Sequence, residues 1–423
     1  MKKSYYISIT LFILLSSTVI SIAQTGWVQQ SSGTGYTLNS VFFLDTNIGY
    51  IVGDTTIGSV RFQIILKTTN GGLNWINQTP LFPNNQNALK SVFFVDAMTG
   101  YACGGGNSSS IAFIVKTTNG GANWTTTFNQ SGYSMQSIYF LNALTGIAIG
   151  GSYYRFFRTT DGGYNWTNTY FPLNNGSMTS VYFPDQLTGY AAGPDTNIYK
   201  TTNAGVNWSQ IFYVGPNISS IFFINILTGW MVGQSVVLKT TSGGNNWLSY
   251  SISYSLYSVR FVNDQTGWVC GSSGSIYFTT NGGTNWTQQQ TSITSTLNSL
   301  SFVNAQTGWA VGVNGRILKT TTGGITFIKQ VSNEIPSVYK LDQNFPNPFN
   351  PSTNIKYQIA KSSFVQLKIF DVLGKEVGSL VNEQQKPGIY EVSWNASGYP
   401  SGIYFYKVIA GTFTGAKKMV VVK

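Results

Sequence analysis

Histidine is absent from this chain, and glutamate is absent from residues 24–333. Catalysis of the Ser/His/Asp or Cys/His kind needs an imidazole base, so that chemistry is excluded. Glycoside hydrolysis needs two carboxylates a few ångströms apart, but most aspartates of residues 24–333 lie in repeated turn sequences. Spacings typical of metal ligands are missing as well. We therefore predict a non-enzyme without catalytic residues, cofactor-binding residues or a metal site.

Charge is also scarce, since only 9% of residues are charged, although the formal net charge is +11. The basic side chains form no run of the kind that nucleic acid binding requires, so we reject nucleic acid as a partner. The long apolar run from Ile7 to Ile20 follows Lys2 and Lys3. It predicts a secretory signal peptide over residues 1–23. A membrane anchor is the weaker alternative, because the run is short for a span, and the mature chain has no other candidate.

Only two cysteines are present, and a disulfide would be the usual inference for a secreted chain. Cys103 and Cys270 occupy the same place in copies two and six of the repeat described next, where the other copies have Val, Ile or Ala. Copies two and six are not neighbours, so the sulfur atoms should be far apart. We predict two buried free thiols that act as small apolar residues.

A repeat of roughly 40 residues fills most of the chain. In its clearest copy, residues 91–96 read SVFFVD, residues 99–104 read TGYACG and residues 116–124 read KTTNGGANW. The central phenylalanine recurs as Phe43, Phe94, Phe140, Phe183, Phe223, Phe261 and Phe302. An aliphatic residue two places earlier predicts a strand with one apolar face. The Asp or Asn that follows, and the glycine after it, predict a turn.

Seven copies with four short strands each predict an all-β fold, with residues 24–331 forming a seven-bladed β-propeller around a central channel. The seventh copy lacks the tryptophan that begins the fourth strand in the others, since residues 323–327 read GGITF. Residues 26–30 read GWVQQ and match the start of such a strand. We therefore expect Trp27 to begin the outer strand of blade seven and to fasten the first and last blades together.

The turn between the third and fourth strands resembles the Asp-box, or BNR repeat, of sialidases and related propellers. Residues 159–166 read TTDGGYNW and fit its pattern fully, while the other copies replace Asp with Asn or Ser. Asp161, Gly162, Gly163 and Trp166 are accordingly expected to be structural turn residues. The longer unit resembles the photosystem II assembly and stability factor family of seven-bladed propellers over residues 26–330. That family carries an arginine-rich patch, which the scattered arginines of this chain do not reproduce.

After a linker over residues 332–338, residues 339–351 read YKLDQNFPNPFNP. They resemble the start of the type A C-terminal sorting domain found on cargo of the type IX secretion system, and the match extends to the final KKMVVVK. The resemblance implies that residues 339–423 engage the type IX machinery and send the chain to the outer cell surface or the medium. Alternating apolar residues predict five to seven strands in a small immunoglobulin-like β-sandwich. A carbohydrate-binding or adhesive module is the alternative.

Loop length gives the remaining clue to a site, because alternate connections of a blade emerge on the same face. The first turn and the box turn are regular, whereas the connections on the other face vary and are longest in copies one to three. Extra loop length costs little stability and often carries binding. Tyr153, Tyr154 and Arg155 combine aromatic faces with a fixed charge that suits a glycan or peptide. The alternative is an edge strand whose aromatic side chains only pack.

A basic residue also precedes the Thr-Thr pair in six copies, as Lys67, Lys116, Arg158, Lys200, Lys239 and Lys319. Such a ring could attract an acidic partner, or its members could be edge residues laid over apolar neighbours. We predict a secreted or cell-surface, non-catalytic binding scaffold for an unknown glycan or protein. A sialidase-like glycan hydrolase and an assembly or stability factor for a membrane protein complex are the alternatives.

Overall fold

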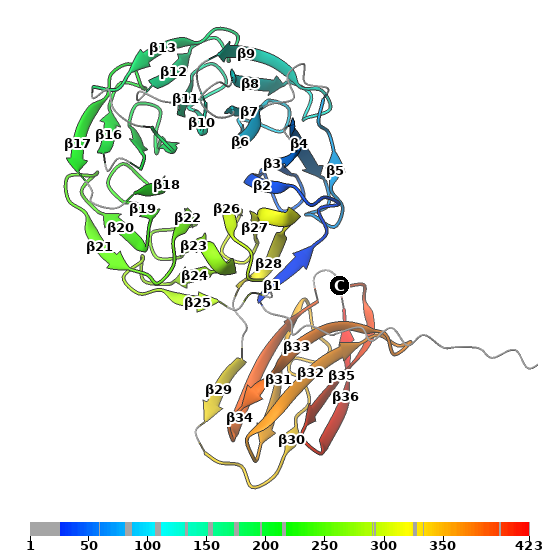
Figure 1. Cartoon of the computed structure of the whole chain (residues 1–423). Coiled ribbons are helices and arrows are strands. Elements are labelled where there is room, and N and C mark those ends of the chain that lie inside the picture. The colour runs from blue at the N-terminus through cyan, green and yellow to red at the C-terminus, as the bar shows by residue number, and fades with distance from the viewer. Residues whose placement is uncertain are drawn as a thin grey trace, which may run out of the picture. The chain divides into compact units, whose positions relative to one another are not determined.

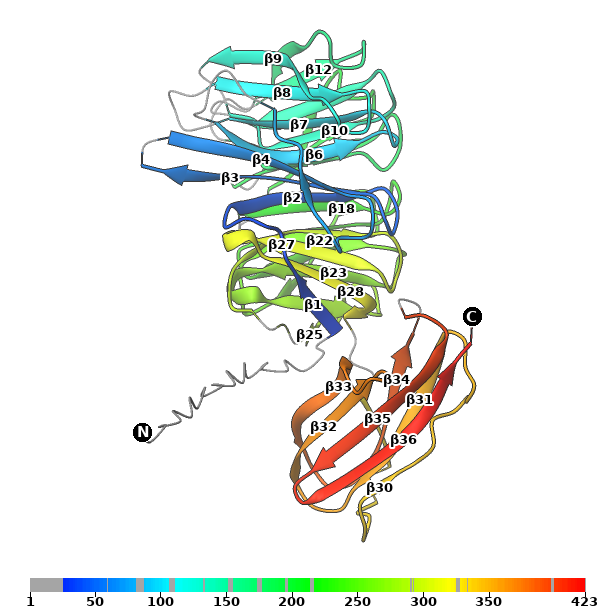
Figure 2. The same cartoon turned by 90° about the vertical axis from the view of Figure 1, so that its right-hand side faces the viewer.

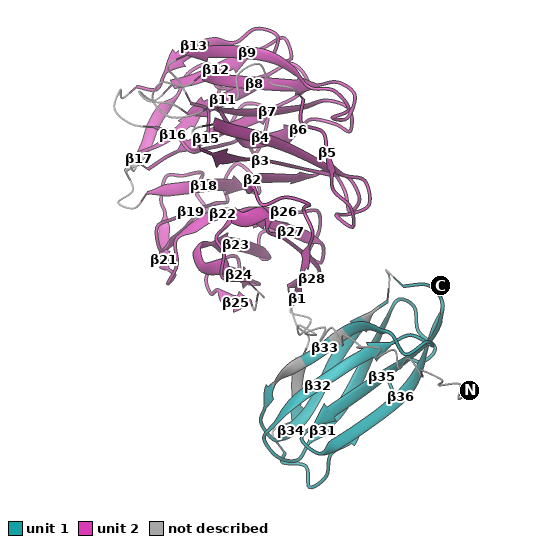
Figure 3. Cartoon of the chain, turned by 45° about the vertical axis from the view of Figure 1, so that its right-hand side comes forward, with its two compact units in different colours: residues 1–24, 327–423 teal, residues 25–326 magenta. Residues whose placement is uncertain are grey.

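The chain divides into two compact units in this computed structural model, one spanning Thr25–Thr326 and the other containing Phe327–Lys423 (Figure 3). The structure describes residues 26–58, 60–80, 87–105, 111–131, 134–150, 155–172, 177–194, 197–213, 217–289, 291, 293–324, 328–332, 334–396 and 399–422. The predicted signal peptide lies outside these residues. Within them, no helix is long and apolar enough to cross a membrane.

Four-stranded antiparallel sheets form the first unit, arranged as blades around one axis (Figure 1). Six blades use four consecutive strands, with the first strand innermost. They are β2 (Thr37–Phe43), β3 (Gly49–Ile57), β4 (Val60–Thr68) and β5 (Ile76–Asn77) in blade 1; β6 (Ala88–Phe94), β7 (Gly100–Gly105), β8 (Ile111–Thr117) and β9 (Thr125–Ser131) in blade 2; β10 (Ser137–Phe140), β11 (Gly146–Gly150), β12 (Arg155–Thr159) and β13 (Thr167–Tyr170) in blade 3; β14 (Ser180–Tyr182), β15 (Gly189–Ala192), β16 (Asn197–Thr201) and β17 (Ser209–Tyr213) in blade 4; β18 (Ile218–Phe223), β19 (Gly229–Gly233), β20 (Val236–Thr240) and β21 (Leu248–Ser251) in blade 5; and β22 (Leu256–Phe261), β23 (Gly267–Gly271), β24 (Ile276–Thr279) and β25 (Thr287–Gln289) in blade 6.

Blade 7 takes its strands from both ends of the first unit, which confirms the predicted closure. It contains β26 (Leu297–Phe302), β27 (Gly308–Gly312) and β28 (Ile317–Gly324), with β1 (Gly26–Gln30) as its outer strand. Val28 pairs with Lys319 across the β1–β28 ladder. Trp27 is 1% exposed, and its Nε1 donates to Oε1 of Gln289 in blade 6 at 2.7 Å. Short 3₁₀ turns at Ser272–Gly274 and Val313–Gly315 replace longer loops in blades 6 and 7.

The serine that precedes the aliphatic residue of each repeat links neighbouring blades. The hydroxyl oxygen of Ser40 accepts a hydrogen bond from the Val92 backbone N–H of the next inner strand at 3.3 Å. Five further serine hydroxyl oxygens accept the equivalent bond from the next inner strand: Ser91, Ser137, Ser180, Ser258 and Ser299. The serine satisfies a backbone donor that has no ladder partner on the inner edge. Its recurrence in the sequence therefore reflects a blade-to-blade bond.

The first turn and the box turn of each blade lie on the same face and are joined by a backbone bond. In blade 2 the Gly120 N–H donates to the Met98 carbonyl at 2.8 Å. The same bond occurs in all seven blades, and in blade 4 an alanine, Ala204, is the donor. We call this side, where the sequence is most regular, the turn face. The opposite side, with the connections of unequal length, is the variable face.

At most junctions between blades, an aromatic side chain packs against the next blade. It is the second residue of the second strand of its own blade. Tyr101 stacks on Phe140 of the next blade, with ring centroids 3.6 Å apart, and its hydroxyl donates to the Gly162 carbonyl at 2.9 Å. The same contacts are made by Tyr50, Tyr190, Trp230, Trp268 and Trp309. Blade 3 has Ile147 at this place.

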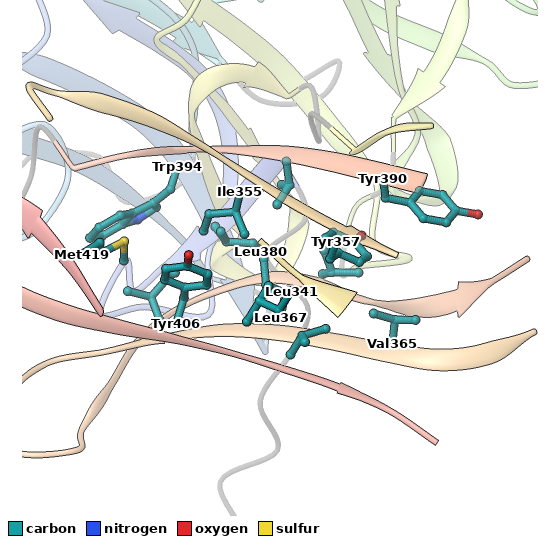
Figure 4. Packing of buried hydrophobic residues seen from close by; sticks show 14 of the residues in the cluster. Leu341, Ile355, Tyr357, Val365, Leu367, Leu380, Tyr390, Trp394, Tyr406 and Met419 are labelled. Carbon is teal, nitrogen blue, oxygen red and sulfur yellow. The ribbon is translucent and has the colours of Figure 1, made fainter. Parts of the chain in front are cut away.

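Two four-stranded sheets form the second unit, in the orders β29-β34-β31-β30 and β33-β32-β35-β36. Its strands are β29 (Ile328–Ser332), β30 (Lys340–Leu341), β31 (Ser352–Ile359), β32 (Ser363–Phe370), β33 (Glu376–Gln385), β34 (Gly388–Asn395), β35 (Gly402–Ala410) and β36 (Phe413–Val421). One core lies between the sheets and includes Ile355, Leu367 and Tyr406 (Figure 4). Residues 339–423 thus hold seven of these strands, within the predicted five to seven, and β29 adds an eighth from the chain before them. The immunoglobulin-like assignment stays a prediction.

The boundary between the units differs from the one expected from the sequence. The repeat pattern places residues 328–331 in the propeller and residue 332 in the linker. They form β29 and pair with β34, where Lys329 lies opposite Glu391. The β1 strand already fills the outer place of blade 7, so the chain after Gly324 is free to join the second unit.

Candidate functional site

A long hairpin of blade 1 stands out on the variable face, because β3 and β4 extend beyond the neighbouring strands (Figure 2). Its tip exposes Ile57 and Val60. At its base Asp54 is only 5% exposed and accepts from Nε of Arg61 at 2.7 Å. A buried carboxylate needs such partners, since an unpaired buried charge is costly.

The same carboxylate joins blade 1 to blade 2. Nζ of Lys90, on the inner strand of blade 2, lies 3.7 Å from Asp54, and Nδ2 of Asn39 donates to it at 2.6 Å. Burial lowers the pKa of Lys90, and the charge of Asp54 opposes that shift. In the sequence, Asp54 and Asp195 are the two aspartates of residues 24–333 that lie outside the repeat pattern. The contacts of Asp54 anchor the hairpin. Asp195 lies outside the described residues.

Of the three candidate ligand-binding residues in blade 3, only Arg155 is described; Tyr153 and Tyr154 lie outside the described residues. The Arg155 guanidinium carbon lies 4.4 Å from the centre of the Tyr170 ring on β13, and Nη2 hydrogen-bonds to the Tyr170 hydroxyl. Tyr170 is 47% exposed. A flat cation over an exposed ring is a surface suited to ligand contact. The next residues, Phe156 and Phe157, are buried and belong to the core.

The four box-turn residues of blade 3 lie on the turn face. Oδ1 of Asp161 accepts from the backbone N–H groups of Tyr164 and Asn165 at 3.0 and 2.9 Å. Gly162 and Gly163 have φ of 72° and 83°, a region that favours glycine. Nε1 of Trp166 donates to the Gly163 carbonyl at 3.1 Å. Asp161 and Trp166 thus make their hydrogen bonds inside the turn, and the two glycines supply its backbone conformation.

Hydrogen bonds to the Asp161 carboxylate also set its acidity. The Asn165 backbone N–H, the Asn165 side chain and the Thr159 hydroxyl lower the pKa of Asp161 to about 2. Hydrogen bonds to the charged form of a carboxylate favour that form. The equivalent Asn119 of blade 2 makes the same bond to the backbone N–H four residues on, at 2.9 Å. An amide thus replaces the carboxylate without changing the turn.

The recurring basic residues reach across the blade junctions on the turn face. Nζ of Lys116 donates to the Gly162 carbonyl of the next blade at 2.8 Å, and Lys67 and Lys200 make the equivalent bonds. Nε of Arg158 donates to the Ala204 carbonyl at 3.0 Å. These contacts give the basic residues a packing role between blades, which favours the second of the two interpretations drawn from the sequence.

Both cysteines are buried and free, as predicted. Burial raises the pKa of the Cys103 thiol and of the Cys270 thiol. A raised pKa keeps a thiol in its unreactive protonated form. No group of three or more His, Cys, Asp or Glu side chains placed to hold a metal ion occurs among the residues that the structure describes.

A feature that the sequence reading missed lies around the axis. The residue before each central phenylalanine lies on the innermost strand of its blade, and we call these seven residues the axial belt. They are Phe42, Phe93, Tyr139, Tyr182, Phe222, Arg260 and Ser301. Ring centroids of successive members are 4.8–5.4 Å apart from Phe42 to Phe222. In the sequence these aromatic residues recur directly before the central phenylalanine in five copies. Aromatic residues are common in strands, so this recurrence alone does not indicate a contact between blades.

The last two members of the axial belt are not aromatic. The Arg260 guanidinium carbon lies 5.8 Å from the centre of the Phe222 ring, and the Ser301 hydroxyl accepts from the Phe43 backbone N–H. Phe42, Phe93, Tyr139, Tyr182 and Arg260 are all half-buried, while the flanking residues of their strands are mostly buried. The belt is therefore partly open to solvent.

Two family models match parts of the chain. The model described as photosynthesis system II assembly factor YCF48 matches residues 249–322, and the secretion system C-terminal sorting domain matches residues 343–422. No curated protein matches the sequence.

Solved structures share the propeller fold at low sequence identity. YCF48 bound to D1 peptide aligns with a TM-score of 0.58 and 19% identity, covering 71% of this chain and 98% of that one. YCF48 from Cyanidioschyzon merolae gives 0.52 and 18%, covering 70% and 98%. The WD40 β-propeller domain of Doa1 gives 0.54 and 12%, covering 69% and 96%. The chain thus joins a seven-bladed propeller, resembling the YCF48 assembly factors in its repeats, to a type IX secretion sorting domain.

Proposed function

We propose that this chain is a secreted or cell-surface binding scaffold whose propeller holds a peptide or protein segment on the variable face. The observation that carries the proposal is that a sorting-domain match over residues 343–422 follows a seven-bladed propeller along the chain. The sorting domain indicates export by the type IX system. The propeller is then the cargo, and its activity takes place outside the cell.

Binding rather than catalysis follows from how the propeller uses its acidic groups. Asp54 is held in an ion pair, and Asp161 holds a turn. Asp45, Asp96 and Asp185 likewise accept from backbone N–H groups of the first turns. A hydrolase needs carboxylates free to exchange protons with a substrate. The sialidase-like alternative predicts turnover of chromogenic glycosides, and the scaffold proposal predicts none.

A peptide is favoured over a glycan by one comparison. A similar propeller, YCF48, has been solved with a D1 peptide bound. On this chain the hairpin tip of blade 1, with Ile57 and Val60, offers apolar surface. In blade 3 the exposed Tyr170 ring and the half-buried Arg155 against it offer an aromatic and a cationic group. Such side chains are enriched at protein interfaces. A glycan stays a second candidate because aromatic faces also suit sugars.

A peptide and glycan array probed with the full chain tests the proposal, with binding then measured for variants. Changing Tyr154 and Arg155 together to Ala should weaken binding at least about tenfold, with little change in melting temperature. Tyr164→Ala, an exposed tyrosine on the turn face, is the matched control and should bind normally. Equal loss in both variants, or loss that follows stability, would contradict the assignment to the variable face.

The assembly-factor alternative makes a different prediction. A chain that assists a membrane complex should co-purify with that complex from cell envelopes. The scaffold proposal predicts that the exported chain is recovered without one.

A further inference from the structure

Two charged residues lie on the seven inner strands, Lys90 and Arg260. Lys90 has a counter-charge, because Asp54 lies 3.7 Å from its Nζ. Arg260 takes part in none of the ion pairs among the described residues. Its hydrogen bond runs from Nη1 to the adjacent Val259 carbonyl at 2.9 Å.

The fold does not require a cation at this place. In the other six blades the equivalent residue is an aromatic side chain or Ser301, on the same inner strand. Burial lowers the pKa of Arg260, which means that the surroundings disfavour its charge. Holding a guanidinium there without an anion costs stability. An arginine that replaces a ring at such a cost suggests a ligand that supplies the anion.

The surroundings of Arg260 define what that ligand looks like. The Phe222 ring lies on one side of the guanidinium, at 5.8 Å. Beyond Phe222 the rings of Tyr182 and Tyr139 continue the belt, with centroids 4.9 Å apart between Phe222 and Tyr182 and 5.3 Å apart between Tyr182 and Tyr139. Flat rings therefore line the belt beside the cation, and the group is half-buried rather than sealed.

We propose that the axial belt is a second binding site, which takes a carboxylate carried on a flat apolar group. The forked guanidinium of Arg260 donates two parallel hydrogen bonds to the carboxylate, and the belt rings stack on the apolar part. The bonds are strong there because the surrounding rings reduce screening by water. This site is separate from the variable face and does not depend on the peptide proposed to bind there.

Calorimetric titration of the full chain tests the site with benzoate and with its neutral amide, benzamide. Benzoate should bind and benzamide should not, because only the carboxylate pairs with Arg260. Arg260→Phe copies the residue that blades 1, 2 and 5 use at this place. It should weaken benzoate binding at least about tenfold while the melting temperature stays equal or rises. Arg260→Lys should retain part of the affinity.

Two further measurements are needed. One identifies what kind of molecule supplies the carboxylate, and the other tests whether any lost cation has the effect of losing Arg260. A short peptide ending in Phe, tested with a free and an amidated C-terminus, distinguishes a chain end from a small organic acid. Lys418→Gln, an exposed cation of the second unit, should bind as the unchanged chain does. The proposal is overturned if neither benzoate nor the free-carboxylate peptide binds, or if Arg260→Phe binds benzoate as well as the unchanged chain.

Discussion

Six junctions between blades are closed by an aromatic side chain, and the junction between blades 3 and 4 is closed by Ile147. At the six, a Tyr or Trp ring stacks on the next inner strand and donates to a box-turn carbonyl. Ile147 has no such donor, and the Ala204 carbonyl receives Nε of Arg158 instead. The ladder between the second and third strands pairs Gly with Thr at its turn end in both blades, as Gly146 with Thr159 and Gly189 with Thr201.

The comparison separates a required contact from a replaceable one. The box-turn carbonyl has a donor at every junction, but the donor changes. The Gly323 carbonyl receives both Trp268 and Nε2 of Gln289, where Phe278 stands in place of the basic residue. A buried carbonyl without a donor is costly, whereas an apolar side chain can fill the space of a ring. The repeat therefore conserves hydrogen-bond satisfaction more strictly than side-chain type.

The largest expected difference is in the free energy of unfolding, when an aromatic junction residue and Ile147 are each changed to leucine. Trp268→Leu removes a fully buried ring and one donor, so we expect a loss of about 3 kcal/mol in the free energy of unfolding. Ile147→Leu keeps volume and removes no donor, so its loss should stay below about 1.5 kcal/mol. Urea denaturation followed by tryptophan fluorescence measures both. Equal losses would show that the aromatic contact is not what distinguishes the junctions.

The sequence predicted the blades but not their junctions. The repeat gave the strand order, the number of blades and the place of Trp27, because alternation and turn residues act within one copy. The roles of Ser40, Lys116 and Tyr101 depend on a partner in the next copy, which spacing along the chain does not reveal. The same limit hid the axial belt, whose members meet only around the closed ring.

The junction between blades 3 and 4 also differs on the blade 4 side, where Ala204 lies in the box turn. It has a φ of 57° where the equivalent residue of the other six blades is glycine. A side chain in this region is strained, so Ala204→Gly should raise the free energy of unfolding by about 1 kcal/mol. Gly243→Ala, at the same place in blade 5, should lower it by about as much or more. Thermal unfolding of both variants measures the pair, and a loss of stability in Ala204→Gly would contradict the strain.

The smallest expected effect is on how stability depends on pH. It is tested by comparing the box turn of blade 3 with that of blade 2. The pKa of Asp161 is lowered to about 2 by hydrogen bonds from Asn165 and Thr159. A carboxyl whose folded-state pKa is depressed contributes stability above its ordinary pKa of about 4, and that contribution is lost as the pH falls towards 2. Asp161→Asn should therefore leave stability at neutral pH nearly unchanged and flatten its fall between pH 4 and pH 2.

The reverse change in blade 2 provides the matched test. Oδ1 of Asn119 accepts from the Thr117 hydroxyl and the Asn123 backbone N–H with an uncharged amide, so Asn119→Asp should add a fall in stability over the same pH range. Urea midpoints measured at intervals from pH 5 to pH 2 report both variants. If Asp161→Asn kept the slope of the unchanged chain, the carboxylate would not be held by the turn. The preference for Asp in blade 3 would then need an explanation outside the turn, such as contact with a partner on that face.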